Sequence, residues 1–404
     1  MRRSIAAFAG AALAASLLAA PAGGQAVDIE KSDTIKRVGG VRFEGGTELA
    51  AIAGRVFAGQ LDGGAAPPSR GTVPDRGGFH ILDVTGKVRE IGALNCPGND
   101  NDVEVVNERI VALGFHENRC APAAGNGFML VDVKNPRKPR IVGMVATNKN
   151  HTFKPLPGTP YIYTAGGGLT GGPAAGPAVV DVSNPRKPEV VARPQTITMD
   201  CHDISFWVGK ERSLGFCAGA VGTGEVQIWD VTDPLAPVTI GRIVNPLIQY
   251  SHYAVASSDG QVLAIDDEAF AAHDCNTGMS PTGRVWLYDI SNPELPLLQG
   301  SYAPPRGGSD DTFGIGHLPG WVPSWCLSHG LDWAPGTRYL AVTWFTGGVS
   351  VLDVSNPASP VEHAYWRASD STTYSALWHD GRLYTNDMTR GVDAFEVKGV
   401  RATR

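Results

Sequence analysis

The amino-acid sequence predicts a single all-β domain, a seven-bladed β-propeller with four-stranded blades. A short motif with an acidic residue near its end recurs seven times along the 404 residues. Between the motifs lie β-branched and apolar runs, separated by Gly, Pro and Asn and without helical periodicity. The 50 glycines and 29 prolines show no three-residue period, which excludes collagen and favours a turn-rich β fold. A repeat of about 40–50 residues that holds four strands is typical of a propeller blade.

The repeated motif is clearest in GFMLVDV (127–133) and EVQIWDV (225–231). Five repeats continue into an Asn-Pro or Asp-Pro turn, in which the Asx side chain bonds its own backbone and Pro fixes φ. The acidic residues at the next-to-last position of the motif are Asp83, Asp132, Asp181, Asp230, Asp289, Asp353 and Glu396. Because acids and turns recur in nearly every repeat, we interpret them as parts of the scaffold.

The repeats also predict where each blade lies and how the ring closes. In the second repeat, the expected strands are 102–106, 109–114, 127–133 and 140–145. The last repeat supplies only three strands, and residues 35–43 resemble the fourth strand of other repeats. We therefore expect residues 35–43 to complete the last blade, which removes exposed sheet edges. The single domain should span 33–404, with blades at about 46–95, 100–147, 150–195, 200–246, 250–305, 327–368, and 372–398 joined by 35–43.

The motifs resemble those of the LVIVD-repeat family of exported β-propeller proteins. Leu-Val-Asp-Val-Lys-Asn-Pro (130–136), Val-Val-Asp-Val-Ser-Asn-Pro (179–185) and their counterparts carry the resemblance, which covers nearly all of the chain after its first residues. The resemblance implies the fold. It implies no particular reaction, so function has to be sought where the repeats differ from one another.

The first residues predict export. Arg2 and Arg3 precede an apolar stretch over 5–20, and small residues follow at 20–22 and 24–26. This pattern is typical of a secretory signal peptide over 1–26, cleaved near 22 or 26, and indicates a secreted or periplasmic protein. A membrane anchor is the alternative, but the apolar stretch is short and rich in alanine. We expect no later segment to span a bilayer.

Charge and cysteine content narrow the partners and suggest disulfides. The formal net charge is -6 with no long basic run, which argues against a nucleic-acid partner. Six cysteines in an exported chain indicate disulfides. From their places beside neighbouring strands, we predict the pairs Cys96–Cys120, Cys201–Cys217 and Cys275–Cys326. The alternative is a metal-ligating cysteine, for which Cys201 beside His202 is the candidate.

Candidate functional residues occupy one repeat-equivalent position, where the first strand of each blade enters the central channel. The seven residues at this position are Glu48, Asp102, His151, His202, His252, His329 and Tyr374. Four of the ten histidines in the chain therefore fall on four consecutive blades. Imidazoles without a thiolate suit Fe, Cu or Zn, so we predict that His151, His202, His252 and His329 bind a transition metal. Glu48, Asp102 and Tyr374 would orient these ligands or contact the substrate. The alternative is that each histidine only hydrogen-bonds a neighbouring blade.

The same face should carry further polar and aromatic groups, because first strands begin and second strands end there. These are His116-Glu117, Asp266-Asp267-Glu268, His273-Asp274, Asp387 and an insertion over 301–326 with Phe313, Trp321 and Trp325. Such a pocket suits a small molecule, and a solvated rim is the alternative. The sequence thus predicts an exported metal-dependent enzyme, an oxygenase, oxidase or hydrolase that acts on a small molecule. The competing prediction is a non-catalytic propeller that binds a protein or glycan.

Overall fold

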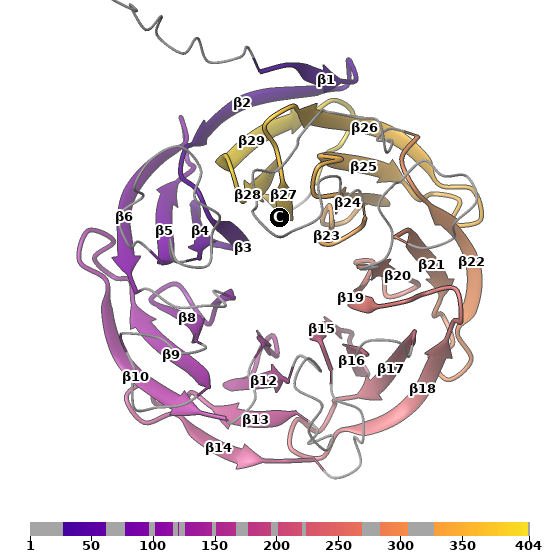
Figure 1. Ribbon diagram of the computed structural model, residues 1–404. Coiled ribbons are helices and arrows are strands. Elements are labelled where there is room, and N and C mark those ends of the chain that lie inside the picture. Colours follow the sequence, from indigo (N-terminus) through magenta and orange to yellow (C-terminus); the bar gives the residue numbers. More distant parts are fainter. Residues whose placement is uncertain are drawn as a thin grey trace, which may run out of the picture.

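The computed structural model describes residues 27–61, 77–96, 102–115, 120, 126–147, 151–166, 177–194, 201–219, 224–268, 283–305 and 327–402. Within these residues the chain forms seven antiparallel sheets arranged in a ring, and no helix (Figure 1). The seven-bladed propeller predicted from the repeats is therefore confirmed. The predicted signal peptide, 1–26, lies outside the described residues.

Blades 1 to 4 follow one another along the chain, each with its first strand innermost. Blade 1 consists of β3 (Gly46–Ile52), β4 (Arg55–Gln60), β5 (Gly78–Asp83) and β6 (Arg89–Asn95). Blade 2 consists of β7 (Val103–Val105), β8 (Ile110–Phe115), β9 (Gly127–Asp132) and β10 (Arg140–Ala146). Blade 3 consists of β11 (Thr152–Pro155), β12 (Tyr161–Ala165), β13 (Ala178–Asp181) and β14 (Glu189–Ala192). Blade 4 consists of β15 (Asp203–Val208), β16 (Ser213–Ala218), β17 (Glu225–Asp230) and β18 (Val238–Val244).

Blades 5 to 7 complete the ring and include the two N-terminal strands. Blade 5 consists of β19 (Ser251–Ala256), β20 (Val262–Asp267), β21 (Val285–Asp289) and β22 (Leu297–Tyr302). Blade 6 consists of β23 (Leu331–Trp333), β24 (Tyr339–Thr343), β25 (Val349–Asp353) and β26 (Val361–Ala368), with β1 (Ile29–Lys31) at its edge. Blade 7 consists of β27 (Thr373–His379), β28 (Arg382–Asp387), β29 (Gly391–Val397) and β2 (Ile35–Val41).

Ring closure takes place as predicted, through pairing of β2 with β29. The two strands are antiparallel, from Ile35 opposite Val397 to Val41 opposite Val392. The sequence had not predicted β1, which pairs with β26 and makes blade 6 five-stranded. Two hydrogen bonds between Asp28 and Ser369 extend this pairing.

The hydrophobic core consists of seven layers, each shared by two neighbouring blades. Because successive side chains of a strand point to opposite sheet faces, Phe57 of β4 packs toward blade 2 while Val56 and Ala58 pack toward blade 7. In β28, Leu383 packs toward blade 6 and Tyr384 toward blade 1. The last of these layers joins blades 7 and 1, so burial of apolar surface is continuous around the ring.

The repeat acids and Asx-Pro turns are structural. Asp132 accepts the N–H of Lys134 at 2.9 Å, and the same two-residue bond occurs at Asp83, Asp181, Asp230, Asp289 and Asp353. Each fourth strand then has a register shift opposite the third strand. Glycines follow this bulge in five blades. At Gly241 an added Cβ would lie 2.0 Å from the Pro293 carbonyl of the next blade's turn, so only glycine allows the two blades to approach this closely.

Candidate metal centre

Four histidines and one tyrosine lie in an arc around the centre of the ring. The inner strand of blade 3 begins directly after His151, and that of blade 4 directly after His202. In blade 6 the inner strand begins two residues after His329. The other two residues, His252 and Tyr374, lie within the inner strands of blades 5 and 7. The ring centroids are 4.3 Å apart for His151–His202, 4.3 Å for His202–His252, 4.2 Å for His252–His329 and 4.0 Å for His329–Tyr374. The structure thus brings five of the seven predicted positions into direct contact.

Two of these histidines are fixed by hydrogen bonds to the next blade. Nδ1 of His202 lies 3.3 Å from the carbonyl of His252, and Nδ1 of His329 lies 2.9 Å from the carbonyl of Tyr374. A carbonyl oxygen can only accept, so Nδ1 carries the hydrogen in both rings and Nε2 keeps its lone pair. Metal-bound histidines are held in the same way, with one nitrogen donating to the protein and the other on the metal.

His252 lies at a β-bulge and beside Asp266. Ser251 pairs with Asp267 and Ala254 with Ile265, so β19 contains one extra residue between these pairs. The N–H that the bulge frees, that of Tyr253, donates to Oδ1 of Asp266 at 2.5 Å. The other oxygen of Asp266 lies 3.4 Å from Nδ1 of His252.

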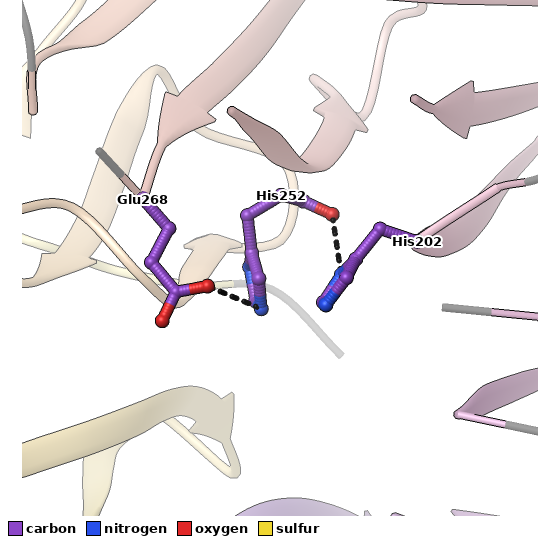
Figure 2. Close-up of side chains that lie close together, drawn as sticks. All are labelled: His202, His252 and Glu268. Atoms are coloured by element: carbon purple, nitrogen blue, oxygen red, sulfur yellow. Dashed lines mark hydrogen bonds and ion pairs between the residues drawn. The ribbon is translucent and has the colours of Figure 1, made fainter. Parts of the chain in front are cut away.

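A buried carboxylate completes a set of three possible ligands. One ligand atom from each of His202, His252 and Glu268 lies within 4.8 Å of the other two (Figure 2). Glu268 follows β20, and its two oxygens lie 3.7 Å from Nε2 of His252 and 3.9 Å from Nε2 of His329. Bonds of about 2.0–2.2 Å to one tetrahedral ion separate ligand atoms by about 3.3–3.6 Å, so the most distant pair would have to approach by about 1 Å to bind the same ion. Two imidazoles and one carboxylate suit Zn²⁺ or Fe²⁺.

Burial sets the protonation states of these residues. It holds the pKa of His202 and His252 well below their usual range and lowers that of His329 to about 3, so the rings are neutral at physiological pH. Burial also raises the pKa of Glu268 to about 8. A bound cation would favour the ionised carboxylate, because a metal competes with protons for its ligands.

The remaining predicted residues border two cavities in the central channel. Glu48, Asp102, His151, His252 and Tyr374 line a small cavity of about 30 Å³, which is room for one or two waters. Glu48, Asp102, His252 and His329 also line a larger cavity of about 420 Å³. Asp102 has a structural bond as well, because its Oδ2 accepts the N–H of Phe153 in blade 3 at 2.8 Å.

Other polar residues predicted for this face have structural partners. Asp267 accepts the N–H groups of Gln249, Tyr250 and Gly283, and Asp387 accepts that of Thr372. Glu268 therefore differs from its neighbour Asp267, and it was predicted only as one acid of this face. Adjacent residues at the end of a strand point to opposite sides, and this alternation is the sequence signal that could have distinguished the two acids. His116, Glu117, His273, Asp274, Phe313, Trp321 and Trp325 lie outside the described residues.

Two of the three predicted disulfides are present. Cys96 pairs with Cys120, and Cys201 pairs with Cys217. The second bridge links the residue before His202 to β16, so it fixes the backbone at the start of the blade 4 inner strand. It also shows that Cys201 is not a free thiolate ligand. The third predicted pair, Cys275–Cys326, lies outside the described residues.

The sequence did not single out a set of charged residues deeper in the channel. Glu104, Lys154, Asp203 and Asp332 line the larger cavity. Glu104 lies two residues after the predicted channel position Asp102, so the two-residue alternation of a strand could have placed it on the same face.

Fold and site together define a β-propeller with an arc of four histidines near its centre. The LVIVD repeat family matches this chain at residues 123–147 and 338–365, which confirms the resemblance inferred from the motifs. Among solved structures, the chain is similar to the β-propeller domain of Cps50 (Swd1) from Myceliophteria thermophila, with 13% identity and a TM-score of 0.56. That likeness covers 90% of this chain and 100% of the other and shows the fold alone. No curated protein matches significantly.

Proposed function

We propose that this protein is an exported metal-dependent enzyme that acts on a small molecule. The observation that carries the proposal is the convergence of His202, His252 and Glu268, three buried side chains whose ligand atoms lie within 4.8 Å of one another. His329 offers a further position, since its Nε2 lies 3.9 Å from Glu268. His151 borders the set on the other side, in ring contact with His202. The proposed site thus keeps the four predicted histidines and adds one carboxylate.

The residues around the site have separate tasks in this proposal. A bound Fe, Cu or Zn ion would supply either oxygen activation or a water of lowered pKa for hydrolysis. The carbonyls of His252 and Tyr374 orient the imidazoles of His202 and His329, and Asp266 lies beside the imidazole of His252. The 420 Å³ cavity admits a small substrate beside His252 and His329, and Glu48 and Asp102 face that substrate from the opposite blades.

Export is part of the proposal. The disulfides Cys96–Cys120 and Cys201–Cys217 are compatible with an oxidising compartment. The described residues contain no helix with the length and hydropathy that crossing a bilayer requires. The N-terminal sequence pattern over 1–26 supports secretion or delivery to a periplasm.

Metal analysis of single and double variants tests the proposal. We expect one equivalent of a transition metal in protein purified from its native compartment. His202→Ala and His252→Ala should each lose most of it, and the double variant should lose little more. His363→Ala is the matched control, because this histidine bonds the Lys398 carbonyl at the outer rim. Metal retained in both single variants, with additive losses of thermal stability, would contradict the metal centre.

A non-catalytic binding propeller is the second candidate function. It is favoured by the hydrogen bonds of His202 and His329, which join neighbouring blades without any metal. In this case the same variants would change stability alone. The absence of metal from native protein, together with failed reconstitution by Fe, Cu and Zn, would favour a propeller that recognises a protein or glycan.

A further inference from the structure

The larger cavity contains an excess of acidic side chains. Its described lining includes five carboxylates, those of Glu48, Asp102, Glu104, Asp203 and Asp332. Lys154 is the only lysine or arginine among these described lining residues, and its ammonium is paired with Glu104. Four carboxylates therefore face the cavity without a cationic partner from the described lining.

Three of these four carboxylates accept a hydrogen bond from a backbone N–H. Asp102 accepts the N–H of Phe153 at 2.8 Å, Asp332 that of Trp378 at 2.6 Å, and Asp203 that of Ile204 at 2.7 Å. Glu48 differs, because its carboxylate has no hydrogen bond to any described residue. Burial and the nearby charge of Asp203 raise the pKa of Glu48 to about 8, although Lys154 opposes the rise.

A second observation in the same cavity indicates a ligand. His329 borders the cavity and is only 2% exposed. Its Nδ1 is bonded to the Tyr374 carbonyl, whereas its Nε2 has no hydrogen bond within the described residues and lies 3.9 Å from Glu268. This nitrogen keeps a lone pair, so it can accept a hydrogen bond from a molecule in the cavity.

The shape and the remaining walls suit a small organic molecule. A volume of about 420 Å³ falls within the range of ligand pockets. Tyr253 presents its ring 5.7 Å from the Lys154 ammonium, so an aromatic face is already oriented toward positive charge in this cavity. Leu156, Tyr161 and Leu377 add apolar surface to the wall.

We propose that the cavity binds a small molecule that carries a positively charged amine. The ammonium group lies between Glu48 and Asp203, which border both cavities, and the rest of the molecule extends toward His252 and His329. This inference deepens the proposed function by naming its substrate class. Binding of the amine itself does not require the metal.

Calorimetric titration of metal-free protein with matched probes tests the inference. One set is 1,4-diaminobutane, 1,4-butanediol and succinate; the other is benzylamine, benzyl alcohol and benzoate. We expect at least one amine to bind about tenfold or more tightly than its alcohol, and no binding of the carboxylates. Equal affinity for amine and alcohol in both sets would overturn the inference, as would a lack of amine binding.

Two substitutions should act in opposite directions. Glu48→Gln removes a carboxylate while keeping its size, and should weaken amine binding about tenfold. Lys154→Met removes the only ammonium among the described lining residues and frees Glu104, so it should strengthen amine binding. Glu396→Gln, at an exposed position of β29 away from the cavity lining, is the control, and thermal midpoints verify folding. Unchanged amine affinity in Glu48→Gln would contradict the proposed position even if Lys154→Met fails to fold.

The metal centre and the amine site fail separately. If the natural protein binds no metal but still binds the amine, and His202→Ala binds the amine equally well, the metal centre is overturned and this inference stands. Metal binding by a protein that does not distinguish amines from alcohols would do the reverse.

Discussion

Oδ2 of Asp266 lies 3.4 Å from Nδ1 of His252, while Oδ1 of the same carboxylate accepts the N–H of Tyr253. One buried side chain therefore stabilises the bulge in β19 and lies beside the imidazole at that bulge. Because burial raises the pKa of Asp266 well above its usual range, an amide can replace this carboxyl group with little change in charge.

We predict that Asp266→Asn folds normally but binds metal about 10–100-fold more weakly, as is typical when the partner of a metal-bound histidine is changed. Competition with a chelator of known affinity measures the loss. Asp332→Asn is the matched control, since Asp332 also accepts a backbone N–H on an inner strand. Equal metal affinity of the two variants would show that Asp266 only supports the bulge.

Gly241→Ala should destabilise the fold by about 1–3 kcal/mol, because its Cβ would meet the Pro293 carbonyl at 2.0 Å and force two blades apart. Chemical denaturation provides the measurement. Gly86→Ala, where a Cβ meets no atom within 4 Å, should change stability by less than about 0.5 kcal/mol. Similar losses in both variants would mean that the contact between blades yields easily.

Removal of the Cys201–Cys217 bridge in a double alanine variant should cost about 3 kcal/mol, the value expected for a loop of this length. It should also weaken metal binding, because Cys201 directly precedes His202 and the bridge fixes that backbone. The corresponding variant of Cys96 and Cys120 should lose stability and keep its metal affinity. A bridge that serves only the fold would leave metal affinity intact in both variants.

Glu48 should make stability depend on pH. Its pKa rises from 4.5 in a model peptide to about 8 in the folded protein, chiefly because of burial; Asp203 and Glu104 add to the rise, and Lys154 and His151 oppose it. The folded state thus holds a proton that the unfolded chain has released, and this contribution, complete below pH 4.5, is lost as pH rises through 8. Glu48→Gln should gain stability relative to the natural protein between pH 5 and 9, by about 1 kcal/mol or more. Urea unfolding at several pH values would show no such trend if Glu48 were solvated.

Two N-terminal deletions separate the roles of the first two strands. Loss of residues 27–44 removes β2, exposes the edge of β29 and should cause aggregation. Loss of residues 27–33 removes only β1, so the ring stays closed and the protein should remain monomeric. Size-exclusion chromatography and thermal midpoints distinguish the two. A monomeric, equally stable product of the longer deletion would contradict closure by β2.

The fold could be predicted because its determinants recur. Each blade repeats the acid and most repeat the Asx-Pro turn, so a weak local signal is read seven times, and the missing last strand could be found by its similarity to other fourth strands. The strand β1 was missed because Ile29–Lys31 has neither the repeat motif nor enough length for a two-residue alternation.

The candidate site was predictable only to the level of a face. Repeat alignment placed His202 and His252 at equivalent positions, and their contact follows from the convergence of inner strands. Alternation could separate Glu268 from Asp267, but it could not say which of the two acids lies near the histidines, because the bulge in β19 decides where His252 lies. The deeper carboxylates were missed because no repeat motif marks them.

The pairing of β2 with β29 also fixes an order of events during biosynthesis. Ile35 finds its partner Val397 only after almost the whole chain has been made, so the first strand of the ring waits unpaired while the other blades form. Contacts this distant in sequence form slowly, and the waiting strand is open to wrong partners, including the same strand of another molecule. Its yield on refolding should therefore fall as protein concentration rises.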